Sequence, residues 1–135
     1  MTKESDPTPR WQKLVWPLIL AAAIFGASGT SDVPGPVIPY LDKVVHFSLF
    51  GLLGTVVLRA TLAMPRGWIW AVVIVSLFGL SDEWHQSFTP GRSVEFADWV
   101  ADTLGAIVAV ALYQLWPAYR AFLEHPLGRR YHPRD

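Results

Sequence analysis

The sequence predicts an all-α integral membrane protein, a four-helix bundle with both termini in the cytoplasm. Apolar residues make up 52% of the 135 residues and charged residues only 16%, a composition typical of membrane proteins. Four apolar stretches approach the roughly 20 residues that a helix needs to cross a bilayer core. Basic residues are concentrated on one side of these stretches, and acidic residues gather on the other side.

The four predicted spans are separated by residues that end helices. The spans are Leu14 to Gly29, Val44 to Met64, Trp68 to Gln86, and Trp99 to Trp116. Pro65 and Gly67 divide the second span from the third, and Pro117 ends the fourth. The chain is therefore expected to consist of a cytoplasmic N-terminal segment (1–13), a membrane domain (14–116) and a basic cytoplasmic tail (117–135).

The distribution of lysine and arginine predicts the orientation. Three precede the first span, two flank the second connection and four follow the fourth span, so nine of the eleven lie on one side. Only Lys43 and Arg92 lie on the other side. The positive-inside rule then places both termini in the cytoplasm of a multi-pass plasma (inner) membrane protein. The first span also resembles a secretory signal that ends near Gly29, and its cleavage would leave three spans in the same orientation.

The composition also argues against several classes of function. The chain has no cysteine, so it has no disulfide, no thiolate nucleophile and no cysteine metal ligand. The formal net charge is zero, and no basic stripe with interleaved aromatic residues indicates nucleic-acid binding. We expect no nucleic-acid partner, no cofactor and no metal. Membrane lipids are the expected partners, and a homo-oligomer is an open alternative.

Charged side chains are expected at membrane depth near the outer face. The uninterrupted apolar run from Trp68 to Leu80 is only about 20 Å long at 1.5 Å per residue, which is too short to cross alone. Either the residues from Ser81 to Gln86 complete the helix in the outer leaflet, or the helix ends early against a water-filled opening, and both alternatives bring carboxylates to membrane depth. On the fourth span, Asp98 and Asp102 lie one turn apart and share a face. Ionisable groups at this depth cost about 2.5–3.5 kcal/mol unless they are paired or hydrated. They are therefore expected to have partners or a function.

We predict that these groups form one ligand-binding site at the outer face. Its candidate residues are Lys43, His46, Glu83, Gln86, Arg92, Asp98 and Asp102. The segment Thr89-Pro90-Gly91-Arg92 predicts a turn with a positive φ at glycine, which would project Arg92 back towards the acids.

Simpler roles remain open for each of these residues. Arg92 would then only neutralise a carboxylate, Asp98 would only cap the fourth helix, and His46 and Gln86 would only hydrogen-bond between helices. His85 is expected to face solvent rather than to take part in chemistry.

One combination of residues resembles a known family. Asp42-Lys43-x-x-His46-Phe47, then Glu83-x-x-Gln86-x-Phe88-x-Pro90-Gly91-Arg92, then Asp98 before a helix with Gly105, is similar to the VanZ-like membrane proteins. The resemblance implies a small multi-span helical protein in a family without an established biochemical activity. Its founding member is associated with teicoplanin resistance, so a link to glycopeptide resistance is an implication of the resemblance alone. Asp102 departs from the family pattern, which usually has asparagine there.

Three functions remain open at this stage. The first is binding or modulation of the headgroup of a cell-envelope lipid or lipid-linked cell-wall precursor, with Lys43, His46 and Arg92 meeting phosphate. The second is a membrane-embedded hydrolase or transferase acting on a phosphate-containing lipid. Its catalytic candidates are His46 or Glu83 as general base, Arg92 as anion stabiliser, and Asp98. The third is a proton-coupled transporter or a subunit of a larger membrane complex.

A metal-dependent version of the enzyme would use His46, Glu83, Asp98 and Asp102. This oxygen-rich set suits Mg²⁺, Mn²⁺ or Ca²⁺ better than structural Zn²⁺. The sequence contains no HExxH motif, no phosphate-cradling glycine loop and no nucleophile elbow. Whether the protein is an enzyme is therefore left open by the sequence.

Overall fold

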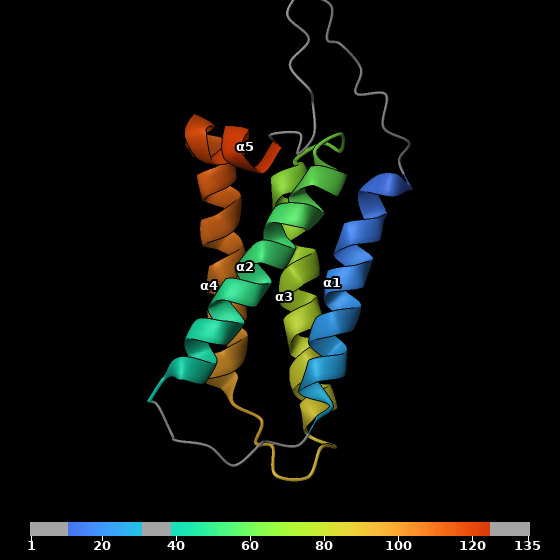
Figure 1. Ribbon diagram of the computed structural model, residues 1–135, viewed down its shortest axis with the longest axis vertical. Coiled ribbons are helices and arrows are strands. Elements are labelled where there is room, and N and C mark those ends of the chain that lie inside the picture. The colour runs from blue at the N-terminus through green and yellow to red at the C-terminus, as the bar shows by residue number, and fades with distance from the viewer. Residues whose placement is uncertain (1–10, 31–38, 125–135) are drawn as a thin grey trace, which may run out of the picture.

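The computed structural model describes residues 11–30 and 39–124, which are 81% helical and contain no strand. The helices are α1 (Gln12–Ser28), α2 (Leu41–Thr61), α3 (Gly67–Gln86), α4 (Phe96–Leu115) and α5 (Pro117–Glu124). Helices α1 to α4 run alternately up and down one bundle, and α5 lies across one end of it (Figure 1). The start of α1 and the end of α4 therefore lie at the same end, as the predicted topology requires.

Three of the helices are long and apolar enough to cross a membrane. They are α2, α3 and α4, each of 20 or 21 residues, whereas α1 is apolar but has only 17 residues. Helices α2 and α4 begin three residues earlier than predicted, at Leu41 and Phe96. Their first turns contain Asp42 and Asp98, and acids are favourable there because they face the positive end of the helix dipole.

The segment after α4 is also more structured than predicted. Residues 117–124 were expected to begin a basic tail, but they form α5. Trp116 is extended, with φ −114° and ψ 97°, because the residue before a proline avoids the helical region. Pro117 then starts the new helix, a position where its missing N–H is not needed. Helix α4 thus ends at Leu115, and the chain changes direction into α5.

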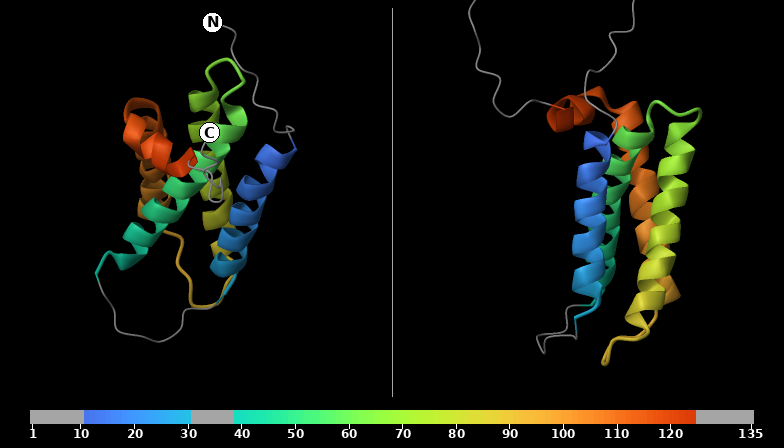
Figure 2. Two further views of the ribbon diagram at one scale, coloured as in Figure 1. Left: turned by 45° about the horizontal axis from the view of Figure 1, so that its top comes forward. Right: turned by 90° about the vertical axis from the view of Figure 1, so that its right-hand side faces the viewer.

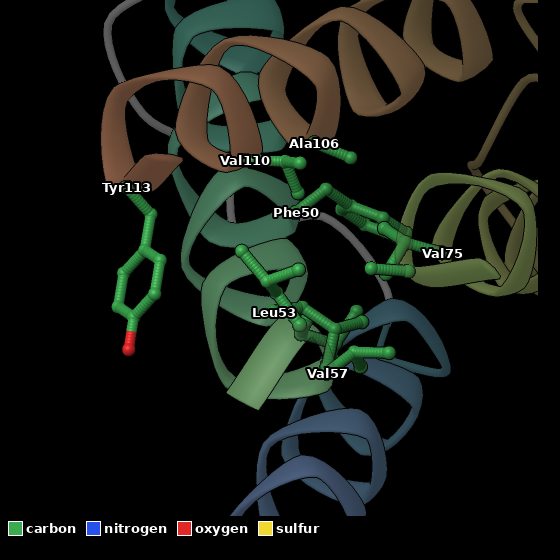
Figure 3. Close-up of a cluster of buried hydrophobic side chains, with 10 residues drawn as sticks. Phe50, Leu53, Val57, Val75, Ala106, Val110 and Tyr113 are labelled. Atoms are coloured by element: carbon green, nitrogen blue, oxygen red, sulfur yellow. The ribbon is translucent and has the colours of Figure 1, made fainter. Parts of the chain in front are cut away.

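The core lies in the middle of the bundle and has contributions from all four long helices. Its buried side chains are Ile24, Phe50, Leu53, Val57, Leu58, Ala71, Val75, Ala106, Val110 and Tyr113. Figure 3 shows Phe50 of α2, Val75 of α3 and Val110 of α4 pointing towards one another. The outward faces are apolar too, with Leu77 62% and Leu52 47% exposed. A bundle that is apolar on both sides is expected in lipid rather than in water.

Helices α2 and α4 make the most extensive contact and approach very closely. A Cβ atom on Gly105 would lie 2.1 Å from the backbone oxygen of Phe47, and one on Gly54 would lie 3.0 Å from the Cα of Ala106. Small residues permit such backbone contact between membrane helices. This contact fixes the start of α2 against the first half of α4.

Two further views of the bundle show which segments share the end opposite α5 (Figure 2). The ends of α1 and α3 lie there, together with the starts of α2 and α4. We call this the polar end, because it holds the buried charged residues described next.

Candidate functional site

Five polar or charged side chains of α3 and α4 are buried at the polar end. They are Asp82, Glu83, Gln86, Asp98 and Asp102, which are 1%, 3%, 3%, 6% and 0% exposed. The α3 residues follow Gly79 at helical spacing, and the α4 residues precede Gly105 in the same way, so both sets face the bundle. These five side chains therefore lie inside the bundle rather than on its outer surface.

The innermost group consists of His46, Glu83 and Asp102, which we call the carboxylate–histidine cluster. His46 Nδ1 lies 2.9 Å from Asp102 Oδ1. Glu83 Oε2 accepts a hydrogen bond of 3.0 Å from the backbone N–H of Glu95. Each of the three residues offers one possible ligand atom, and these atoms lie within 4.8 Å of one another. The cluster joins α2, α3 and α4.

Two oxygen atoms of this cluster are buried without a hydrogen bond. Glu83 Oε1 and Asp102 Oδ2 have no partner among the described residues. An unpaired buried acceptor costs about 1–3 kcal/mol, and more when it is charged. Gly79 brings the backbone of α3 close to the second of them, since a Cβ there would lie 2.9 Å from Asp102 Oδ2. The fold therefore buries two carboxylate oxygens without a hydrogen bond from the described residues, and this arrangement destabilises the protein unless another group binds them.

A second group surrounds Lys43 nearer the rim. Lys43 Nζ lies 2.8 Å from Asp42, 2.7 Å from Glu95 and 2.8 Å from Asp98. An ammonium group has three N–H donors, and each has a carboxylate here. Lys43 is therefore already neutralised within the protein, which weakens its predicted role as a phosphate ligand.

A third group ties α1 to α3. Ser28 Oγ lies 2.5 Å from Asp82 Oδ1, and Gln86 Nε2 donates to Asp82 Oδ2 at 3.2 Å. Gln86 was a candidate ligand, and its amide already has a partner on its own helix. Ser28 was not among the candidates. Its small side chain gave no signal beyond its place at the end of an apolar run.

Arg92 lies in the turn that the sequence predicted. Gly91 has φ +84°, and the backbone N–H of Arg92 donates to Thr89 at 3.1 Å. The guanidinium Nε donates to the carbonyl of Thr30 at 3.3 Å, next to the end of α1. Within residues 11–30 and 39–124, the ion pairs of the buried acids involve Lys43 and His46 instead. Arg92 is thus placed at the rim of the polar end.

Two of the simpler expectations are wrong. Asp98 is not the cap of α4, because Glu95 occupies that position without a side-chain cap, and Asp98 pairs with Lys43. His85 does not simply face solvent. Its ring stacks on Phe25 with centroids 3.8 Å apart, and its Nδ1 is buried without a partner among the described residues. Glu95, which sequence reasoning missed, contacts both the rim and the inner group.

The charge balance of the polar end is strongly acidic. The three groups contain six carboxylates, and in the part of the chain that the structure describes the cations paired with them are Lys43 and, if protonated, His46. Such a surface attracts cations and hydrogen-bond donors and repels bare anions. The site is therefore unlike a simple phosphate pocket.

Comparison with known proteins agrees with this architecture. A family model described as VanZ/LLP1 matches residues 5–117, which include all four long helices and every residue of the three groups. Among curated proteins and solved structures, none matches the chain significantly. The family match covers most of the sequence, so this membrane-type helical protein belongs to the VanZ/LLP1 family.

Proposed function

We propose that this protein binds the polar headgroup of a cell-envelope lipid, or of a lipid-linked cell-wall precursor, at its polar end. The observation that carries the proposal is a pair of buried oxygens, Glu83 Oε1 and Asp102 Oδ2, that have no hydrogen-bond partner within residues 11–30 and 39–124. Charged groups within membrane helices are retained where they have a function. A ligand that brings donors or positive charge to these oxygens would give them the partners that the bundle lacks.

In this proposal the polar end faces the extracytoplasmic side of the plasma (inner) membrane. The bias of lysine and arginine towards the opposite end supports that orientation. Helix α1 would be the fourth span, because its 17 residues cover about 26 Å and its end is tied to α3 through Ser28 and Asp82. A signal that is cleaved from the protein would not be expected to form this buried contact.

The acidity of the site limits the chemistry of the headgroup. Amine or hydroxyl groups of the headgroup would reach the carboxylates, and its phosphate would lie at the rim of the polar end, where Arg92 is placed. Phosphatidylethanolamine and phosphatidylglycerol both carry phosphate next to such donors. Undecaprenyl phosphate carries phosphate without them. These three lipids therefore separate the contributions of donor groups and phosphate.

The test is lipid binding by the purified full chain in phosphatidylcholine nanodiscs. Each of the three lipids is titrated against wild type, Glu83→Gln and Asp102→Asn. The control is Ser81→Ala, because Ser81 is an exposed residue of α3 that bonds only the carbonyl of Phe78. We expect both cluster variants to bind about tenfold more weakly, a difference of about 1.4 kcal/mol. Equal binding by wild type and both cluster variants would refute the proposal.

A second candidate function is hydrolysis or transfer at a phosphate-containing lipid, and the His46–Asp102 pair favours it. A carboxylate 2.9 Å from Nδ1 orients the imidazole and leaves Nε2 able to take a proton. Phosphate release from undecaprenyl pyrophosphate, abolished by His46→Ala, would support this function. Absence of release by wild type would exclude that reaction. A link to glycopeptide resistance is tested separately, by comparing teicoplanin susceptibility with and without the protein in cells.

A further inference from the structure

We propose that the carboxylate–histidine cluster, His46, Glu83 and Asp102, binds one divalent metal ion. Binding of the ion needs only these three residues, whereas its contact with a lipid phosphate rests on the function proposed above. The sequence alone suggested no resident metal. It offered a four-residue set that included Asp98, and the structure assigns that residue to Lys43 instead.

The distances within the cluster are close to those of a metal site. The three possible ligand atoms lie within 4.8 Å of one another. Bonds of about 2.0–2.2 Å to nitrogen and oxygen place two ligands of one ion at most about 4.4 Å apart. Shifts of the ligand atoms by a few tenths of an ångström, through side-chain rotation alone, would therefore bring them to these distances. Helices α2, α3 and α4 would not have to move.

Burial gives an independent indication of a ligand. The side chains of Glu83 and Asp102 are at least nine-tenths buried, and each has one oxygen without a hydrogen bond among the described residues. The other oxygen of Glu83 is held by the backbone N–H of Glu95, and that of Asp102 by His46. Glu95 is not one of the three ligands, and its hydrogen bond orients Glu83 as the outer shell of a metal site does. The 2.9 Å between His46 Nδ1 and Asp102 Oδ1 is a spacing that two ligands of one ion can have.

The rim of the same site provides an internal comparison. Asp42, Glu95 and Asp98 form a second group with the same compact spacing of possible ligand atoms. There the protein supplies the cation itself, because Lys43 Nζ lies 2.7–2.8 Å from all three carboxylates. The inner group has equally close acids and no lysine or arginine in an ion pair with them among the described residues. A bound ion would neutralise Glu83 and Asp102 as Lys43 neutralises the carboxylates of the rim.

The ligand set also suits a divalent ion in charge and type. Two carboxylates and a neutral imidazole would balance a charge of +2, which makes burial of the two acids far less unfavourable. One nitrogen and two oxygen ligands fit Mn²⁺ or Zn²⁺ better than a sulfur-seeking metal. Three protein ligands leave coordination positions open for water or a phosphate oxygen. An acidic site would then attract a phosphate headgroup through the ion.

The experiment measures metal binding by the full chain in detergent after treatment with a chelator. Mn²⁺ is titrated and followed by electron paramagnetic resonance, with Zn²⁺ and Mg²⁺ as competitors. We expect one tightly bound Mn²⁺ per chain and a nitrogen coupling from His46 in the pulsed spectrum. Glu83→Gln and Asp102→Asn should weaken binding about tenfold or more, or about 1.4 kcal/mol. Asp42→Asn is the matched control, because it removes an acid of the rim group, and should bind as wild type does.

Mn²⁺ binding by the wild-type protein can refute the proposal without any variant, so the test does not require every variant to fold. Binding of less than one ion per chain, or a bound ion without nitrogen coupling, would refute it. Binding that survives both cluster variants would refute it as well.

Lipid titrations with and without chelator separate this inference from the proposed function. If the protein binds headgroups but no Mn²⁺, the proposed metal site is refuted and the proposed lipid site is not. Mn²⁺ binding without headgroup binding would refute the lipid site and leave the ion. If both claims hold, undecaprenyl phosphate should bind only when Mn²⁺ is present.

Discussion

Replacement of Gly105 by alanine should separate α2 from α4 and disturb the carboxylate–histidine cluster at the same time. The added Cβ would lie 2.1 Å from the backbone oxygen of Phe47 and 2.9 Å from its carbon. Real Cβ contacts essentially never fall below 3.0 Å, so the backbones have to move apart by at least 0.9 Å. Neither helix can relieve the contact by rotating a side chain, because the clash is with backbone atoms.

The expected loss of stability follows from the cost of overpacking. Inserting a methyl group into a closely packed contact costs about 1–3 kcal/mol, which corresponds to a fall in Tm on the order of 5–10 °C for a chain of this size. Asp102 lies one turn before Gly105, and His46 adjoins Phe47. The same separation should therefore lengthen the 2.9 Å contact between His46 and Asp102. We expect ligand binding to fall together with stability.

The assay is thermal unfolding in detergent, followed by circular dichroism and by loss of monodisperse protein. Gly26→Ala is the matched control. It makes the same chemical change in α1, where a Cβ would meet no atom of the described residues within 4 Å, and it should be neutral or slightly stabilising. Equal Tm values for Gly105→Ala and Gly26→Ala would show that α2 and α4 do not pack as closely as described. The geometry described for the carboxylate–histidine cluster would then be incorrect as well.

Three further predictions concern other parts of the polar end. Ser28→Ala should destabilise the bundle by about 1.5–3 kcal/mol, because it removes a hydrogen bond to the buried carboxylate of Asp82; thermal unfolding measures this. Lys43→Met should cost about 1–3 kcal/mol in the same measurement, because three carboxylates lose their common cation. The chain has no cysteine, so single cysteines report topology: a membrane-impermeant thiol reagent should label Ser93→Cys in intact cells and Met64→Cys only after permeabilisation.

Each of these predictions has a control within the chain. Ser81→Ala removes a hydroxyl from exposed α3 surface and should leave the Tm of the protein unchanged, and Lys43→Arg should recover most of the stability that methionine loses. A Ser28→Ala protein as stable as Ser81→Ala would show that α1 is not anchored through Asp82. Labelling of both cysteine variants in intact cells, or of Met64→Cys alone, would contradict the proposed orientation.

Much of the fold was predictable because it depends on features within single segments. Apolar length and helix-ending residues predicted four helices, and helical periodicity placed Asp98 and Asp102 on one face. The glycine in the turn before Arg92 predicted the positive φ that the structure has. The early starts of α2 and α4 were missed because the predicted spans began after Asp42, Lys43 and Asp98, which the structure places in the first turns of these helices. Helix α5 was missed because Pro117 was expected to end the helical region and the residues after it were assigned to a basic tail, although Tyr119, Phe122 and Leu123 recur at helical spacing.

The partners of the site residues were harder to predict, because they depend on how helices pair in space. Nothing in the sequence indicates that Lys43 meets Asp98 on α4 or that Ser28 meets Asp82 on α3. Glu95 was missed although it directly precedes α4. Its side chain pairs with Lys43 of α2 and its backbone N–H donates to Glu83 of α3, and both contacts depend on how the helices pack. The structure places the candidate residues at one end of the bundle, and their division into separate groups could not be derived from the sequence.

The stability of Glu83→Gln in metal-free, lipid-free protein tests most directly whether the carboxylate–histidine cluster exists for a ligand. The amide oxygen of glutamine can still accept the hydrogen bond from Glu95, and the change removes one charge from an acidic interior. We predict a Tm equal to or above that of wild type together with weakened ligand binding, as expected when a charged site is maintained at the expense of stability. A loss of stability as large as that of Ser28→Ala would contradict the account and show that Glu83 serves to hold the helices together.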